Sequence, residues 1–280
     1  MPEGDTIHRV AHTLQRALGD KEVLGFDTTL PSLGAAAPVG LRVTRVHARG
    51  KNLLMEFAGT EGRAPMTLHT HLRMRGDWHI YRPEDRWAKS RRAADIVVTT
   101  NPWIAVGFSM PVAQWVRHGH ASRALRHLGP DLLDDAVKSP HFVERIRSGT
   151  AGVSEGASLI AQEVTLGVAL MDQRRLAGIG NVYKSELCFL AGVDPFAPVG
   201  AMTDEVLLGI VENARRLMRR NLHTPRRMTR MNRRQPLWVY RRRGEPCFRC
   251  GTAVRMRRQG YAARSTYYCP LCQAVSEPPP

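Results

Sequence analysis

The sequence predicts an α+β protein, with an antiparallel β-sandwich flanked by helices in its N-terminal part and a helical lobe with a small metal module in its C-terminal part. Short apolar or alternating runs fill the chain from about residue 22 to residue 108. Beyond Pro130 the apolar residues recur at helical spacing instead. Four of the five cysteines then cluster between residues 247 and 272.

A helix is predicted almost at the first residue. Its apolar positions recur at steps of three and four, which is typical of one buried helix face, and Asp5 is a suitable N-cap. These positions are Ile7, Val10, Ala11, Leu14, Ala17 and Leu18.

The runs LRVTRVHA, NLLMEF, MTLHTHL, DWHIY and ADIVVTT then predict the strands of the sandwich, separated by Gly, Pro and charged clusters. The stretch RPEDRWAKSRR is polar and basic, and we expect an exposed loop there.

The second half contains four helical runs: FVERIRS, SLIAQEVTLGVALMDQ, NVYKSELCFLAG and DEVLLGIVENARRLMRRNL. A basic linker, TPRRMTRMNRRQP, follows, and EPPP is expected to form a disordered tail. We therefore divide the chain into an N-terminal domain (1–120), a helical domain (121–235), a cysteine module (236–274) and a tail (275–280).

The charge points to a polyanionic partner. The net charge is +16, from 41 Lys and Arg against 25 acidic residues, which favours nucleic acid, an anionic membrane or an acidic protein. No apolar window of about 18 residues is present, and the first residues lack the order of a signal peptide, so membrane binding and export are disfavoured. We expect a cytoplasmic protein.

The cysteine spacing C-x2-C-x18-C-x2-C predicts one tetrahedral zinc ion held by Cys247, Cys250, Cys269 and Cys272. Two disulfides are the alternative, which a cytoplasmic location disfavours. Four sulfur ligands leave no position for water, so the zinc is predicted to be structural. Cys188 lies in an apolar run and is interpreted as a core residue.

Two segments of the second half have the composition of phosphate sites. Gly178 and Gly180 predict a tight turn before a helix whose free amides, with Asn181 as cap, could bind a phosphate, and Lys184 adds charge one turn later. A glycine turn that only reverses the chain is the alternative. Between the cysteine pairs, a basic hairpin could lift Arg264 toward a phosphate, although a solvated arginine remains possible.

The chain start offers a nucleophile. Removal of Met1 would leave Pro2 as a secondary amine beside the carboxyl group of Glu3. An α-amine has a reference pKa of about 8, so part of it is unprotonated at neutral pH. It could attack a sugar C1′ to form an iminium while the carboxyl group transfers protons. The alternative is an incidental proline.

Two turns of the first half could serve the same chemistry. Lys51, between two strand runs, could bind phosphate or transfer protons, or it could be an ordinary surface lysine. The segment HLRMRGDW places Leu72 and Met74 beside Arg73 and Arg75, as an apolar wedge that fills the gap left by an extruded base would require. Met74 as a core residue is the alternative.

The paired histidines His69 and His71, like His118 and His120, could suggest a metal pair. No third ligand has a supporting spacing, so we do not predict a metal there.

Taken together, these segments resemble the Fpg/Nei family of DNA glycosylases over nearly the whole chain. The matching segments are PEGDTIHR, RGKNLL, LGPDLL, VALMDQRRLAGIGNVYKSE, GEPCFRCG and RSTYYCPLCQ, in that order. The opening PEG resembles the endonuclease VIII branch, whereas the formamidopyrimidine branch typically opens with PELPE.

The resemblance implies roles for single residues. Pro2 would be the Schiff-base nucleophile, Glu3 the proton donor, and Lys51 a group for β-elimination and DNA backbone binding. Arg264 would bind phosphate and serve δ-elimination, and Asn181, in a helix–two-turn–helix element, would contact the DNA backbone. Two departures stand out: Arg73-Met74-Arg75 replaces the wedge segment that is often QLY, and His127 replaces a backbone-contacting arginine.

We therefore predict a monomeric enzyme that removes oxidised bases, pyrimidines more than purines, from damaged duplex or single-stranded DNA and then nicks the strand. It would need no diffusible cofactor. A zinc-ribbon DNA-binding protein without catalysis is the rival interpretation, and a metal-dependent nuclease is a weaker one, which the all-cysteine site disfavours.

Overall fold

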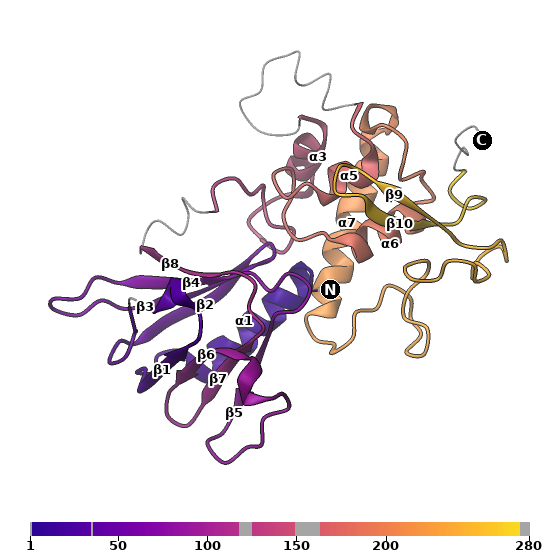
Figure 1. Cartoon of the computed structure of the whole chain (residues 1–280). Coiled ribbons are helices and arrows are strands. Elements are labelled where there is room, and N and C mark those ends of the chain that lie inside the picture. Colours follow the sequence, from indigo (N-terminus) through magenta and orange to yellow (C-terminus); the bar gives the residue numbers. More distant parts are fainter. Residues whose placement is uncertain (1, 35, 118–124, 149–162, 275–280) are drawn as a thin grey trace. The chain divides into compact units, whose positions relative to one another are not determined.

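The computed structural model describes residues 2–34, 36–117, 125–148 and 163–274, and these fall into two compact units that divide between His127 and Leu128 (Figure 1). Each unit has its own hydrophobic core. The segments 118–124, with His118 and His120, 149–162, with the first residues of the predicted run SLIAQEVTLGVALMDQ, and 275–280 lie outside the described residues. Within the described part of that run, the helix covers Leu166–Met171.

The N-terminal unit is a sandwich of two four-stranded antiparallel sheets, with strand orders β1-β6-β7-β5 and β2-β3-β4-β8. The alternation of apolar residues puts one face of each sheet into a shared core. The strands are β1 (Gly25–Thr28), β2 (Val43–Arg49), β3 (Asn52–Phe57), β4 (Met66–Thr70), β5 (Asp77–Tyr81), β6 (Ala94–Thr99), β7 (Ile104–Phe108) and β8 (Ala113–Arg117).

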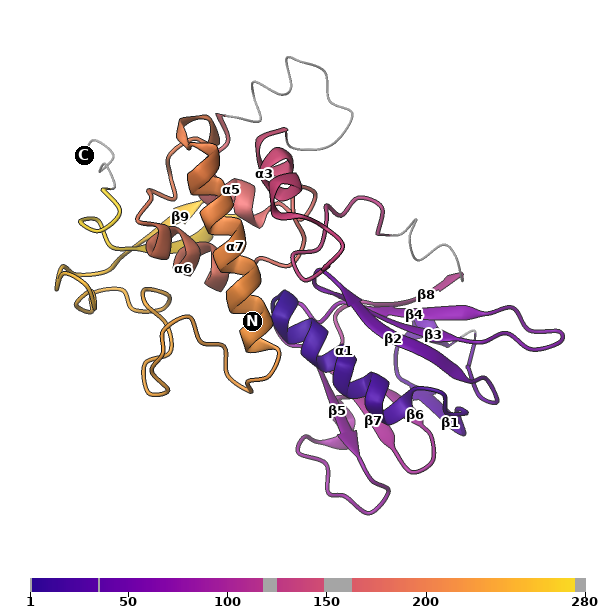
Figure 2. The ribbon, with the colours of Figure 1, turned by 180° about the vertical axis from the view of Figure 1, so that it is seen from behind.

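Helix α1 (Gly4–Leu18) closes one side of this core and packs on β2, β3 and β5 (Figure 2). Ile7, Ala11 and Leu14 point into the core, as the sequence predicts. The N-cap is Glu3 rather than Asp5, because the helix begins at Gly4 and the Asp5 carboxylate accepts the backbone N–H of Thr6 (2.7 Å).

The strand region extends further than the sequence indicates. Strand β8 follows the predicted last strand and pairs with the edge of β4, from Ala113 opposite Thr70 to Arg117 opposite Met66. An edge strand buries few side chains, so its apolar alternation is weak in the sequence.

The C-terminal unit has a helical core, and a small module of residues 244–274, the cysteine hairpin, is attached to it. Helix α6 lies at its centre, and every residue from Asn181 to Phe189 is buried. The elements are α3 (Ser139–Ser148), α5 (Leu166–Met171), α6 (Asn181–Ala191), α7 (Asp204–Asn221), β9 (Arg255–Gln259) and β10 (Arg264–Tyr268), with short 3-10 turns at Pro31–Leu33 and Arg91–Ala93 in the first unit and Val199–Ala201 in this one. None of the helices in the described ranges is long and apolar enough to cross a membrane.

Candidate active site and nucleic-acid interface

The start of the chain lies at one end of the sandwich, because α1 runs antiparallel to β2. The Gln15 side chain accepts the backbone N–H of Val46 (2.5 Å), and the backbone N–H of Asp20 donates to the carbonyl of Val43 (2.8 Å). The C-terminal end of α1 therefore lies at the beginning of β2. Its N-terminal end points toward the end of β2, where the turn with Lys51 follows.

Pro2 is half-buried and directly precedes α1. Its neighbour Glu3 is fully buried, and the carbonyl of Glu3 accepts the N–H of Ile7 (3.1 Å), which closes the first helical turn. The positive end of the helix dipole at this position favours a carboxylate. Glu3, the predicted proton donor, is thus the N-cap of α1, and Pro2, the predicted nucleophile, directly precedes it.

Lys51 lies in the two-residue turn that joins β2 to β3, between the paired residues Arg49 and Asn52. Gly50 has φ +59°, a left-handed conformation that suits the first position of such a hairpin turn. Lys51 is half-buried, and its charge acts on His71 at the end of β4. The Lys51 turn and the end of β4 therefore lie together.

His71 is a neutral group in this site. Burial lowers its pKa to about 4, with the charges of Lys51 and Arg73 acting in the same direction. Its Nδ1 atom accepts the backbone N–H of Arg73 (3.1 Å), which can occur only while Nδ1 carries no proton. His71 therefore fixes the start of the turn that follows β4.

That turn carries Arg73, Met74 and Arg75 on its surface. Arg73 has φ +45°, and Met74 is 60% exposed, so Met74 is not a core residue. Leu72, in contrast, is buried in the core, and the predicted wedge is reduced to Met74 alone.

Behind this turn lies a polar network that the sequence analysis did not identify. The His69 ring bonds through Nε2 to Asn52 Oδ1 (2.9 Å) and through Nδ1 to Gln114 Nε2 (3.1 Å). Asn52 and His69 are buried. His127, expected at the DNA backbone, is exposed and close enough for its charge to lower the pKa of His69, although burial of His69 is the larger cause. The strand pairing that joins these residues leaves no local signal in the sequence.

In the C-terminal unit, the segment between α5 and α6 makes the predicted turn. Gly178 has φ +118°, and the Gln173 side chain accepts the N–H of Gly178 (3.1 Å) and donates to the carbonyls of Met171 and Ile179 (both 2.9 Å). The N-cap of α6 is Gly180, and Asn181 is the first helical residue, so the prediction that Asn181 caps the helix is wrong.

Asn181 instead connects the helix to the cysteine hairpin. Its Nδ2 atom donates to Ser265 Oγ (3.2 Å), while its buried Oδ1 atom has no hydrogen-bond partner within the described ranges. An unpaired buried amide oxygen is costly, and only a ligand that donates a hydrogen bond to Oδ1 would reduce that cost. A phosphate oxygen, which only accepts, could instead take the second N–H of Nδ2.

Lys184 has a different place from the one expected. It is 1% exposed, and its ammonium donates to the Ser265 carbonyl (3.1 Å) and to Thr266 Oγ1 (2.7 Å). Lys184 therefore holds β10 against α6, and its side chain does not present its charge on the surface.

Arg264 starts strand β10 and is exposed. It borders a concave surface of about 340 Å³ together with Arg174, Lys184, Gln259 and Tyr261. Asn181 and Arg264 are thus brought together through Ser265, although 82 residues of chain lie between them.

The four predicted cysteines form one cluster, and they are the only group of three or more potential metal ligands in the described part of the chain. The Sγ distances are 3.9 Å for Cys247 and Cys272 and 3.4 Å for Cys250 and Cys269, and all four atoms lie within 4.8 Å of one another. A tetrahedron with Zn–S bonds of about 2.3 Å has edges of about 3.8 Å, so the cluster fits one structural zinc ion. Cys188 lies apart in the core, and burial raises the pKa of its thiol to about 12.

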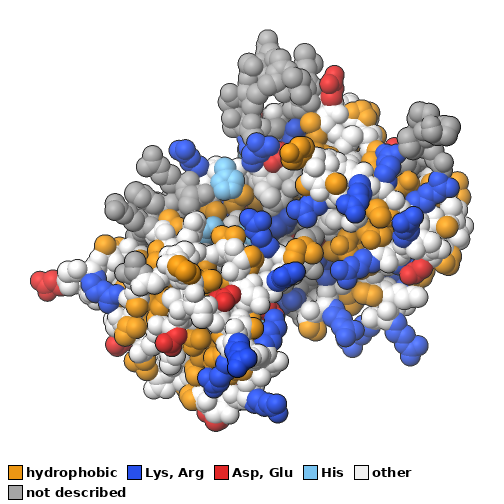
Figure 3. All heavy atoms as spheres, viewed as in Figure 1, with side chains coloured by type: hydrophobic (Ala, Val, Ile, Leu, Met, Phe, Trp, Pro, Cys, Tyr) orange, Lys and Arg blue, Asp and Glu red, His pale blue; other side chains and the backbone are white. Residues whose placement is uncertain are grey.

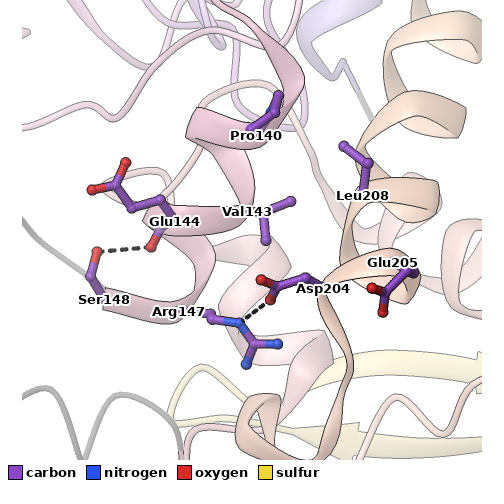
Figure 4. Close-up of a pocket in the computed structure, with 8 residues that line it drawn as sticks. All are labelled: Pro140, Val143, Glu144, Arg147, Ser148, Asp204, Glu205 and Leu208. Atoms are coloured by element: carbon purple, nitrogen blue, oxygen red, sulfur yellow. Dashed lines mark hydrogen bonds and ion pairs between the residues drawn. The ribbon is translucent and has the colours of Figure 1, made fainter.

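A second concave surface, of about 470 Å³, lies between α3 and the start of α7 (Figure 4). Val143 and Leu208 contribute apolar surface, and Glu144, Asp204 and Glu205 contribute acidic groups, with Arg147 paired to Asp204 (2.6 Å). This acidic groove does not suit a polyanion, so we do not include it in the candidate site.

Comparison with known proteins matches the chain to three family models. They are the formamidopyrimidine-DNA glycosylase N-terminal domain (residues 1–107), the H2TH domain of the same glycosylases (128–232) and the zinc finger found in FPG and IleRS (244–275).

Curated relatives match over the full length. A probable endonuclease 8 2 of Streptomyces coelicolor is 38% identical, covering 100% of this chain and 96% of the relative. A DNA-(apurinic or apyrimidinic site) lyase Nei2 of Mycolicibacterium smegmatis is 36% identical, covering 99% of this chain and 100% of the relative.

Among solved structures, the fold resembles that of the Lactococcus lactis Fpg in complex with a DNA that contains N7-benzyl-Fapy-dG. The TM-score is 0.78 at 18% identity, covering 98% of this chain and 100% of that chain. The mixed α+β architecture, the full-length relatives and the three matched domains agree, and the chain belongs to the Fpg/Nei family of bifunctional DNA glycosylase/AP lyases.

Proposed function

We propose that the protein removes oxidised bases from DNA, preferring pyrimidines, and nicks the resulting abasic site through a Schiff base on Pro2. The observation that carries this proposal is the position of Pro2 at the start of α1, at the same end of the sandwich as Lys51, with Glu3 buried beside it.

The first step is displacement of the base. After removal of Met1, the Pro2 nitrogen attacks C1′ of an extruded nucleotide, the new C1′–N bond forms, and the glycosidic bond breaks. The N–H proton that Pro2 loses balances the proton that the departing base takes up. Glu3 supplies a proton as the sugar ring opens, and an iminium results. The helix start keeps the amine and the carboxyl group adjacent without a need for ordering at the moment of reaction.

The second step is elimination. Loss of a proton from C2′ of the iminium expels the 3′ phosphate, and a second elimination expels the 5′ phosphate; water then releases the sugar fragment from Pro2. We assign Lys51 to proton transfer and phosphate binding during β-elimination, and Arg264 to the phosphate during δ-elimination.

Met74, with Arg73 and Arg75, would fill the space left by the extruded nucleotide, since it is an exposed apolar side chain between two cations. Asn181 would donate the second N–H of its Nδ2 atom to the DNA backbone. We do not assign Lys184 to the DNA, because its ammonium is engaged by β10.

The preference for oxidised pyrimidines rests on the resemblance of the opening PEG to the endonuclease VIII branch. A panel of oligonucleotides with defined oxidised pyrimidines and purines, paired and unpaired, tests it. Faster single-turnover release of purine lesions would contradict the preference and leave the amine chemistry standing.

Borohydride trapping on abasic DNA tests the chemistry. The processed protein is expected to form a covalent adduct, whereas a variant that keeps residues before Pro2 should form none at equal zinc content. A zinc-ribbon protein without catalysis would give no adduct in either form, and an adduct in the extended variant would show that Pro2 is not the nucleophile.

A further inference from the structure

The sandwich has a second apolar cluster on the outer face of the β1-β6-β7-β5 sheet. Ile96, Val98 and Ala105 point into the shared core, whereas Val106 and Phe108 alternate to the opposite face. The segment between β5 and β6, residues 82–93, covers this outer cluster with Trp87 and Ala93. We call this segment the basic loop.

The basic loop is anchored along its length. The Trp87 ring stacks on Tyr81 (centroids 5.7 Å apart, 18° between planes) and meets Phe108 edge-on (5.9 Å). The Tyr81 hydroxyl accepts the backbone N–H of Ala88 (3.0 Å), and the backbone N–H of Ser109 donates to the carbonyl of Ala93 (3.0 Å). These contacts fix the backbone of a segment whose sequence indicates only an exposed loop.

Five exposed cations project from this fixed backbone: Arg82, Arg86, Lys89, Arg91 and Arg92. Two guanidinium groups lie over aromatic rings, Arg91 over Trp87 (4.4 Å) and Arg82 over Trp103 (4.7 Å). Stacking on a ring orients the planar group and leaves its N–H donors at the edge available to an anion.

The side chains of Arg86 and Arg92 make no hydrogen bond or ion pair within the part of the chain that the structure describes. The acidic residues of the loop, Glu84 and Asp85, are outnumbered, and the Asp85 carboxylate is engaged by the backbone N–H of Arg82 (2.7 Å). The loop therefore presents a net positive surface.

The basic loop reaches back to the turn that carries Met74. Lys89 pairs with Asp77 at the start of β5 (3.2 Å), two residues after Arg75. Ser109, which bonds to the end of the loop, also lines the concave surface of about 440 Å³ that is bordered by Arg73, Met74 and Arg75. Figure 3 shows lysine and arginine side chains gathered beside β5 on this unit.

We propose that the basic loop is a second DNA-contact surface, which binds phosphates of the duplex that flanks the damaged nucleotide. The inference rests on the proposed function for the choice of DNA as partner. It follows from the continuity of the loop with the Met74 turn, because a duplex bound by that turn continues past it. Cations that are already ordered lose little side-chain entropy when they neutralise phosphates and release the bound counterions.

The test is the salt dependence of equilibrium binding to an undamaged duplex of about 25 base pairs. The variant Arg86→Gln/Arg92→Gln removes two cations that hold no other part of the fold. Each phosphate contact contributes about 0.9 to the slope of log K against log salt concentration, so we expect the slope to fall by about 2. A duplex of about 8 base pairs, too short to reach beyond the Met74 turn, should show a smaller change.

The matched control is Arg16→Gln/Arg45→Gln, which removes the same charge from exposed arginines on α1 and β2. An equal loss of slope in the control would show a general charge effect and overturn the proposal. So would an unchanged slope in the loop variant, as is expected if the loop binds an acidic protein. If borohydride fails to trap the processed protein on abasic DNA but the loop variant has a reduced salt slope, the proposed chemistry is contradicted and this inference is still supported.

Discussion

In the N-terminal unit the candidate site draws on three separated segments: the chain start, the β2–β3 turn, and the end of β4 with the turn that follows it. In the C-terminal unit the site draws on two segments, the glycine turn before α6 and the cysteine hairpin. The residue spacing within each segment is enough to predict its local structure. The first arrangement depends on strand register, and the second depends on local spacing. Loss of the local site should unfold its unit, whereas loss of Lys51, which strand register places, should impair chemistry and leave the fold intact.

The largest effect is expected from Cys269→Ser. Cys269 is buried in the cluster, and its loss should remove zinc and destabilise the C-terminal unit by several kcal/mol, because zinc binding and folding of such modules are coupled. Zinc content and thermal unfolding measure this. Cys188→Ser, which changes a buried cysteine outside the cluster, should keep the zinc, and equal zinc loss in both variants would refute the four-cysteine assignment.

The next effect is on catalysis without unfolding. Lys51→Ala should slow strand nicking at a bound abasic site by about 10²-fold in single turnover, because proton transfer by a positioned group contributes at least this much. The melting temperature of Lys51→Ala should shift no more than that of the control variant Lys21→Ala, which changes another lysine of the same unit. If Lys51→Ala nicks DNA at the normal rate, the role assigned to Lys51 in elimination is wrong.

A smaller effect is expected in the pH dependence of stability. Burial lowers the pKa of His71 to about 4 from an unfolded value of 6.5. Between these values the unfolded chain binds a proton that the folded chain does not, so stability is lost as the pH falls from 6.5 toward 4. After allowance for partial exposure to solvent, the loss should amount to about 1–2 kcal/mol.

Denaturant unfolding across this pH range checks the sign. His71→Gln should reduce the slope of stability against pH, and His12→Gln, at an exposed position on α1, should leave it unchanged. A slope that is unaltered in His71→Gln would show that His71 is not held neutral by the fold.

The sequence predicted the parts of the fold that local rules determine. The spacing of Ile7, Ala11 and Leu14 defines the buried face of α1, and the cysteine spacing alone was sufficient for the zinc cluster. The edge strand β8 escaped prediction because an exposed edge imposes little apolar alternation.

The site was less predictable where its residues meet through tertiary packing. The sequence shows Lys184 one turn into a helix but not that β10 covers it, and it shows Asn52, His69 and Gln114 without the register that joins them. Long-range pairing of this kind has no signature within a single segment.

The central claim is that the processed chain start is the nucleophile, and mapping of the reduced adduct tests it most directly. After borohydride trapping on abasic DNA and proteolysis, mass spectrometry should find the sugar fragment on the peptide that begins with Pro2, attached to its backbone nitrogen. A sugar fragment on Lys51, or on any other lysine, would contradict the account.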